Sequence, residues 1–166
     1  MSLESVRADL AAKAPDLTIL VTDKSSATVA LAAEALGVEP GQIAKTLSVR
    51  VGDRVVLVVT KGTARLVNKK ARAALGAKPR MLGEEEVVAL TCHPVGGVCP
   101  FGLATPLQVY CDVTLKEYAE VWPAAGSINS SVCVTPARMA ELTGATWVDV
   151  AQAPERVADQ AAAEAP

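Results

Sequence analysis

The residues whose types and spacing could do chemistry are concentrated between Cys92 and Gly102. Here the chain reads Cys-His-Pro-Val-Gly-Gly-Val-Cys-Pro-Phe-Gly, an irregular loop rich in glycine and proline. Glycines let the backbone approach a ligand closely, and prolines fix its path. Backbone amides held in that way can stabilise an oxyanion or position a water molecule. A rigid surface turn is the alternative, but so many special backbone residues in one segment favour a site.

Lys45 is a second candidate, within the segment Gln-Ile-Ala-Lys-Thr-Leu of residues 42–47. An ammonium group has three donors and could hold a carbonyl, hydroxyl or phosphate oxygen at the mouth of a pocket. Residue chemistry alone favours the simpler interpretation, a strand lysine that faces solvent. A third segment, Gly-Ser-Ile-Asn-Ser-Ser at residues 126–131, could complete a polar pocket, although such turns are common.

The cysteines and the single histidine allow two further kinds of site. A zinc site needs about four ligands with matched spacing, and the sequence has no pair of Cys-x-x-Cys segments, so we expect neither a metal nor another cofactor. A thiol nucleophile is the other kind, with Cys92 or Cys99 attacking and His93 acting as the base. Cys92 is poorly placed for this role, because neighbouring residues on an extended chain point in opposite directions.

Composition and charge place the chain among ordinary globular proteins. Of its 166 residues, 51% are hydrophobic and 20% are charged, and the net charge is -2. A broad basic surface that coats DNA would need a clear excess of Lys and Arg. One local excess is present, a run without acidic residues whose cations are Lys61, Arg65, Lys69, Lys70, Arg72, Lys78 and Arg80. Such a run is either a solvated face or a surface that contacts phosphate groups.

The N-terminal segment and the apolar runs of the sequence do not indicate a membrane or secreted protein. Apolar residues near the N-terminus alternate with charged residues, unlike a signal peptide, and no apolar run approaches the length of a membrane span. We therefore expect a cytoplasmic protein without disulfides. Cys111 and Cys133 lie within apolar strand segments and are expected in the core.

Hydrophobic periodicity predicts mixed helices and strands. The predicted helices span residues 2–14, 28–36, 68–75, 114–122 and 136–142, and a further helix opens at 83–86. The predicted strands span residues 17–21, 43–51, 54–60, 78–82, 107–113, 132–135 and 146–150. The apolar run at 55–59 indicates a central strand that is covered on both faces. We expect a single α/β or α+β domain over residues 1–166, with a frayed tail at 151–166.

Four stretches of the chain carry a resemblance to a known family. They are residues 35–38 followed by 42–47, the loop at 93–102, residues 125–129, and the terminal Trp-Val-Asp-Val at 147–150. In this order, over about residues 27–150, the chain resembles the YbaK/ProX superfamily, the editing-domain fold of bacterial prolyl-tRNA synthetases that also occurs as free-standing proteins. The resemblance implies an α/β (mixed α+β) domain with a central mixed, partly barrel-like β-sheet flanked by helices.

The resemblance also implies an activity. The implied enzyme is a trans-editing hydrolase that cleaves the ester between a wrong amino acid and the terminal adenosine of tRNA(Pro) or a related tRNA. Lys45 would anchor the substrate end, and the backbone of Gly96 and Gly97 would help to position water. The residues implied in substrate binding are Lys45, His93, Gly96, Val98, Cys99, Pro100, Phe101, Gly126 and Asn129. The family acts without a metal, assisted by a ribose hydroxyl of the substrate, so Cys99 need not be a nucleophile.

The implied partners are the acceptor end of a mischarged tRNA and a synthetase, prolyl-tRNA synthetase or another, with no membrane and no specific DNA. The basic run at 61–80 would then contact the acceptor stem. Relatives clear cysteine, alanine, serine or threonine, and a few pocket residues separate them. A non-catalytic module of the same fold, which binds tRNA or a synthetase, is the alternative function.

Overall fold

The computed structural model describes residues 2–153. Its helices are α1 (Ser2–Lys13), α2 (Val29–Leu36), α3 (Asn68–Leu75), α4 (Glu84–Thr91) and α5 (Pro136–Thr143), with 3₁₀ turns η1 (Pro40–Gln42) and η2 (Val113–Glu117). Its strands are β1 (Ile19–Val21), β2 (Ile43–Val51), β3 (Arg54–Lys61), β4 (Arg65–Leu66), β5 (Arg80–Met81), β6 (Gln108–Asp112), β7 (Trp122–Pro123), β8 (Ser130–Val132), β9 (Thr146–Val148) and β10 (Ala151–Gln152). None of the helices in this range combines the length and apolar character that crossing a bilayer requires.

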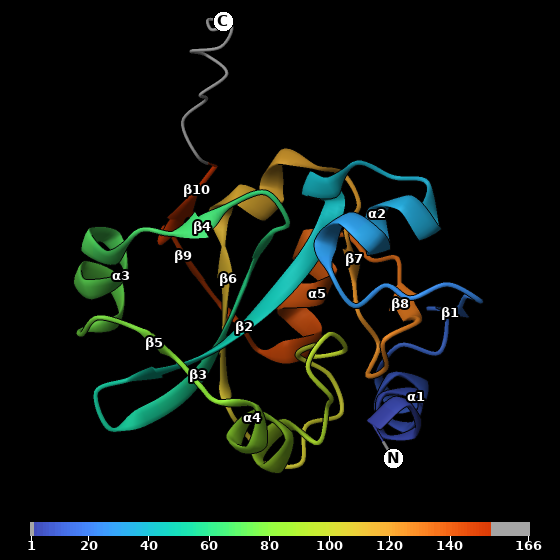
Figure 1. The fold of residues 1–166 in the computed structure, drawn as a ribbon, viewed down its shortest axis with the longest axis horizontal. Coiled ribbons are helices and arrows are strands. Elements are labelled where there is room, and N and C mark those ends of the chain that lie inside the picture. The colour runs from blue at the N-terminus through green and yellow to red at the C-terminus, as the bar shows by residue number, and fades with distance from the viewer. Residues whose placement is uncertain (1, 154–166) are drawn as a thin grey trace, which may run out of the picture.

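The centre of the fold is a mixed sheet with the strand order β5-β2-β3-β6-β9 (Figure 1). β2 and β3 are antiparallel, β3, β6 and β9 run parallel, and β7 adds a short parallel pairing to β2. The run at 55–59 lies in the central strand β3, where Leu57, Val58 and Val59 are completely buried. The expected mixed α+β class is confirmed. Within residues 2–153 the sheet does not close, because β5 and β9 each pair on one side only, so "partly barrel-like" describes it loosely.

Helices pack on both faces of this sheet. Leu57 and Val59 of β3 pack in one apolar cluster with residues of α1 and α5. Val56 and Val58 alternate with them and pack in a second cluster with residues of α3. Figure 1 shows α1 and α3 at opposite ends of the molecule. The N-terminal helix therefore belongs to the core, although it precedes the stretch of about residues 27–150 that carries the family resemblance.

One predicted helix is wrong. Residues 114–122 form the end of the short turn η2 and then an extended segment that leads into β7. The carboxylate of Asp112 accepts a hydrogen bond from the Thr114 amide at 2.9 Å and so caps the turn. Val121 is completely buried in an antiparallel bridge with Val134. The extended chain thus buries the apolar residues whose spacing resembled a helix.

The expected tail begins with an ordered strand. Ala151 and Gln152 form β10, which pairs with β4, and Ala151 is buried. One carboxylate oxygen of Asp112 accepts hydrogen bonds from the amides of Val150 and Ala151, at 2.7 and 3.0 Å. The expected fraying does not apply to these first residues, and the part of that prediction at 154–166 lies outside the described residues.

The outer side of β2 is only partly covered by other strands. β7 pairs with Ile43 and Ala44 at one end, and β5 pairs with Val49 and Arg50 at the other. Between these pairings, no strand in the described range pairs with residues 45–47 on this side. The outer edge of the sheet is therefore interrupted beside residues 45–47 of β2.

Candidate functional site

A pocket of about 250 Å³ opens at the gap beside β2. Its walls come from the segment that leads into α2, from β2 itself, from β5 and α4, from the glycine loop, and from the chain between β7 and β8. The residues that line it include Ser26, Thr28, Ala32, Ile43, Lys45, Thr46, Ser48, Val87, Val95, Gly96, Val98, Trp122 and Ser131. The fold thus brings Lys45 and the glycine loop, which are far apart in sequence, to one pocket.

Lys45 supplies the positive charge of this pocket. Its side chain alternates with that of Thr46 and leaves β2 on the same face as Leu47, which packs in the α3 cluster. The half-buried ammonium makes no hydrogen bond or ion pair with any residue in 2–153. Burial lowers the pKa of Lys45, and the guanidinium of Arg65 lowers it further. An anionic oxygen of a ligand would stabilise such a cation.

Thr46 and Ser48 place two buried hydroxyl groups at the pocket, on the opposite face of β2 from Lys45. Neither hydroxyl has a hydrogen-bond partner within the described part of the chain. Burying such a group unpaired costs about 1–3 kcal/mol, so both are available to a ligand that fills the pocket. Sequence reasoning missed them, although two polar residues at alternate positions of a predicted strand are a signal for one polar face.

The glycine loop reaches the pocket through Gly96. Gly96 has a positive φ of 95°, and a Cβ there would lie 2.9 Å from the Cβ of Ala27. A Cβ on Gly97 would lie 2.8 Å from the backbone of Ser127, and the Gly97 amide donates to the carbonyl of Pro94 at 2.9 Å. Both positions need glycine because atoms of Ala27 and Ser127 leave no room for a Cβ. Of the two, Gly96 lines the pocket and Gly97 packs behind it.

Four of the expected binding residues belong to the loop but do not line the pocket. His93, Cys99 and Phe101 are buried almost completely. The Nε2–H of His93 donates to the carbonyl of Phe101 at 2.7 Å, so its Nδ1 accepts the hydroxyl proton of Ser2. Burial lowers the pKa of His93, which keeps the ring neutral. Pro100 lines a separate surface hollow beside α1.

Helix α1 fixes the far end of the same loop. The Ser5 hydroxyl donates to the carbonyl of Gly102 at 2.9 Å, and the Asp9 carboxylate accepts from the Gly102 amide at 2.8 Å. Gly102 has a φ of 58°, and a Cβ there would lie 2.7 Å from the backbone of α1. The helix and the buried histidine therefore hold the loop from below.

Gly126 and Asn129 support the pocket from behind. The Gly126 amide donates to the carbonyl of Gly97 at 3.1 Å, which joins this segment to the glycine loop. The side-chain amide of Asn129 donates to the carbonyl of Thr22 at 3.0 Å, which ties the same segment to the chain after β1. Of the segment at 126–131 that was expected to complete a polar pocket, Ser131 is the residue that lines it.

The pocket holds no reactive thiol or acid. Cys99 is fully buried, and burial raises its pKa to about 12, which keeps it protonated at neutral pH. The residues that line the pocket include no carboxylate and no imidazole. Across residues 2–153, no group of three His, Cys, Asp or Glu side chains is arranged to hold a metal ion. The available chemistry is therefore that of one ammonium group, several hydroxyl groups and the backbone.

Comparison with known proteins identifies this arrangement. Residues 23–142 match the model of a family described as the aminoacyl-tRNA editing domain. The chain belongs to this family. The matched range includes every residue that lines the pocket, whereas helix α1 of this editing domain lies outside it.

Three similar proteins accompany the family match. The editing domain is 46% identical over 152 residues to the uncharacterized protein YwhH of Bacillus subtilis (strain 168), covering 90% of this chain and 97% of YwhH. It is 31% identical over 121 residues to EbsC of Enterococcus faecalis, named as a candidate Cys-tRNA(Pro)/Cys-tRNA(Cys) deacylase, covering 71% of this chain and 73% of EbsC. A crystal structure described as a candidate trans-editing enzyme for prolyl tRNA synthetase has a TM-score of 0.84 at 35% identity, over 91% of this chain and 97% of that one. The expected YbaK/ProX-like family and fold are confirmed.

Proposed function

We propose that this editing domain hydrolyses mischarged aminoacyl-tRNA in trans, with the aminoacyl ester held in the pocket beside β2. The observation that carries the proposal is the unpaired, half-buried ammonium of Lys45 at a pocket that also presents Gly96 and unpaired hydroxyl groups. The acceptor end of a tRNA offers phosphate, ribose and carbonyl oxygens, all of which accept hydrogen bonds from an ammonium. Lys45 anchors the terminal nucleotide, and the pocket receives the amino acid.

The reaction is attack of water on the ester carbonyl, followed by cleavage of its bond to the ribose oxygen of the terminal adenosine. Negative charge develops on the carbonyl oxygen, and we assign its stabilisation to the loop backbone at Gly96, the glycine that lines the pocket. Because no carboxylate or imidazole lines the pocket, a ribose hydroxyl of the substrate assists in removing the proton of the attacking water. The leaving ribose oxygen takes up a proton, which completes the hydrolysis. An activated ester needs orientation more than a strong base.

The pocket favours a small amino acid with a hydroxyl or thiol group. Its walls are largely apolar, whereas the hydroxyl groups of Thr46 and Ser48 are polar and unpaired. An apolar wall discriminates one methylene by only about 1–3 kcal/mol, but a site that hydrogen-bonds its substrate rejects analogues without that group more strongly. The names of EbsC and of the trans-editing neighbour support tRNA(Pro) as the carrier. We place the reaction in the cytoplasm, where aminoacyl-tRNA is used.

A deacylation panel tests this function. The protein is mixed with tRNAs charged with cysteine, alanine, serine or threonine, and release of the amino acid is followed with time. Lys45→Ala is expected to lower kcat/KM roughly 10- to 150-fold, since a charge-assisted hydrogen bond is worth about 1.5–3 kcal/mol. Arg7→Ala, which removes an exposed cation of α1, is the control and should keep the wild-type rate. Full activity of Lys45→Ala would contradict the anchoring role.

A non-catalytic module that binds tRNA or a synthetase is the second candidate. The observation in its favour is that the pocket walls lack a carboxylate and an imidazole. Measurable binding of tRNA with no hydrolysis across the whole panel would support this candidate and contradict the hydrolase.

A further inference from the structure

Charge is distributed unevenly along this chain. Residues 54–83 carry eight of the 16 Lys and Arg residues and no Asp or Glu. All 18 acidic residues lie elsewhere, so a segment of net charge +8 occurs in a chain of net charge -2. None of these eight cations lines the pocket, so the proposed hydrolysis does not account for them.

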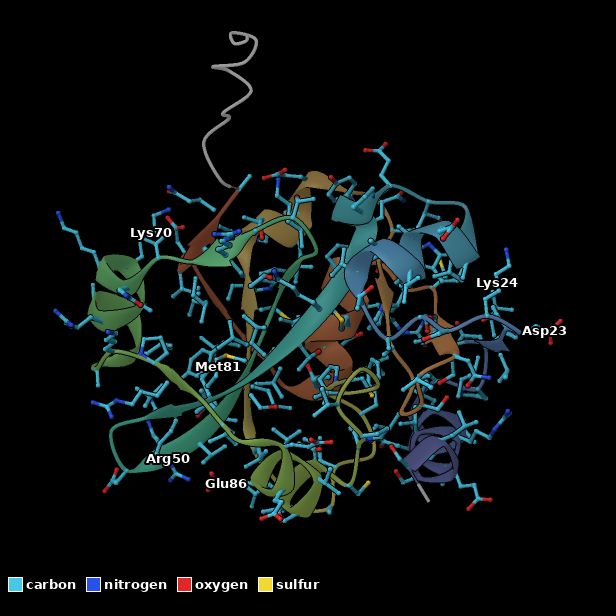
Figure 2. The ribbon with its side chains drawn as sticks, in the orientation of Figure 1. Asp23, Lys24, Arg50, Lys70, Met81 and Glu86 are labelled. Atoms are coloured by element: carbon cyan, nitrogen blue, oxygen red, sulfur yellow. The ribbon has the colours of Figure 1, made fainter. Side chains whose placement is uncertain are left out.

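Three of the eight cations have partners within the fold. Lys61 and Lys70 each form an ion pair, at 2.6 and 3.0 Å, and Arg54 donates to the Tyr110 hydroxyl at 3.1 Å. The other five are exposed and form no ion pair with a described residue. We call these five the basic face: Arg65, Lys69, Arg72, Lys78 and Arg80. Figure 2 shows side chains that end in nitrogen gathered around α3, where Lys70 is labelled.

The basic face approaches the pocket at two places. Arg65 begins β4, and its charge is near enough to Lys45 to lower the pKa of that ammonium. At the other place, Met81 of β5 lines the pocket, and Arg80 precedes it on the same strand. β4, α3 and β5 lie on one side of the molecule (Figure 1). Lys45 leaves β2 on the same face as Leu47, which packs in the cluster of α3.

We infer that the basic face binds the phosphate backbone of a tRNA acceptor stem and directs its aminoacylated 3′ end past Lys45 into the pocket. This inference rests on the proposed function. A double-stranded stem presents phosphates at regular spacing, and cations that neutralise them gain affinity by releasing counterions, without reading the sequence. Lys69 and Arg72 are three residues apart on α3 and so project from the same side of the helix.

Other anionic partners fit this face less well. A helix that binds a membrane surface inserts several large apolar side chains into the lipid, whereas Met81, at the edge of the pocket, is the one large apolar side chain that residues 54–83 expose. A stable protein interface also has an apolar centre, and the basic face has too few exposed apolar side chains to form one. An acceptor stem needs neither, and its 3′ end must reach the pocket in any case.

The inference is tested with a hairpin RNA that copies an acceptor stem. Lys69→Ala/Arg72→Ala is expected to weaken hairpin binding about 10-fold and to reduce the slope of log K against log salt by about 2, because each lost phosphate contact releases roughly one counterion fewer. Both side chains are exposed, so the double variant should melt at the wild-type temperature. Arg7→Ala on α1 is the matched control and should keep both the affinity and the slope.

Two results would overturn the inference. One is wild-type affinity and slope in the double variant. The other is that the double variant loses binding to phosphatidylserine vesicles or to prolyl-tRNA synthetase while its hairpin binding is unchanged.

Failure of the proposed function gives a different pattern. If no aminoacylated tRNA is hydrolysed but the double variant still loses hairpin binding, RNA binding by the basic face is supported and the proposed hydrolysis is contradicted. If Lys45→Ala abolishes hydrolysis and the double variant binds the hairpin normally, the proposed hydrolysis is supported and RNA binding by the basic face is contradicted.

Discussion

The glycine loop has one side that faces the pocket and an underside that is buried, and the two sides differ in their residues and in their roles. The side at the pocket presents Gly96 and Val98, beside Lys45. The underside contains His93 and Cys99, which pack against α1 and are completely buried. The histidine and the thiol, which are the groups most often catalytic, therefore hold the loop in place. The ligand meets an ammonium group, hydroxyl groups and backbone instead.

Disrupting the contact between the glycine loop and the segment at residues 126–131 has the largest expected effect. Gly97→Ala places a Cβ 2.8 Å from the backbone of Ser127, so the loop must move. A displacement of about 1 Å at a reacting group can cost roughly 100-fold in rate, and we expect a loss of that order in kcat/KM for a mischarged tRNA. Gly83→Ala is the matched control, because nothing lies within 4 Å of a Cβ there and its φ is -74°. A Gly97→Ala protein with the wild-type rate would show that this contact does not position the loop.

A change on the pocket side is expected to lower activity while it raises stability. Thr46→Val removes a buried, unpaired hydroxyl at nearly constant volume, so the free energy of unfolding should rise by about 1 kcal/mol. The same hydroxyl is proposed to bind substrate, so kcat/KM should fall about 10-fold, which corresponds to about 1.4 kcal/mol. Urea titration and single-turnover deacylation measure the two quantities.

Thr60→Val is the control for this pair of effects. The buried hydroxyl of Thr60 donates to the carbonyl of Lys61 at 3.0 Å, so its removal should lower the free energy of unfolding by about 1 kcal/mol and leave kcat/KM unchanged. If Thr46→Val and Thr60→Val instead lose stability equally, the Thr46 hydroxyl has a partner inside the protein and is not available to a ligand.

Elements with local signals were predictable from the sequence. The strand predicted at 43–51 and the helix predicted at 68–75 match β2 and α3 residue for residue. Gly52 and Gly76 follow them with positive φ, as a tight turn and a helix end require. Residue chemistry did not join Lys45 to the glycine loop, since their contact depends on packing between distant parts of the chain. The family resemblance supplied that link.

Burial by distant segments was not predictable. His93 was expected among the substrate-binding residues, and no pattern near it shows that Ser2 and α1 cover it. Thr46 and Ser48 form a polar face on β2, and a polar face of a strand usually meets solvent. Here the glycine loop and α4 cover that face, which turns two ordinary polar residues into pocket groups.

The smallest expected effect concerns the underside of the loop and emerges as the pH is lowered. Burial holds the pKa of His93 below its usual 6.5 in the folded protein. Below about pH 6.5 the unfolded chain therefore takes up a proton that the folded chain does not. The contribution of His93 to the free energy of unfolding is complete above that pH, and it declines as the pH falls by at most about 1.4 kcal/mol per pH unit. His93→Gln retains a donor for Phe101 and an acceptor for Ser2 but cannot be protonated, so this part of the pH dependence should disappear. Urea titrations of both proteins between about pH 5 and 8 measure the difference, and parallel curves would contradict a neutral, structural His93.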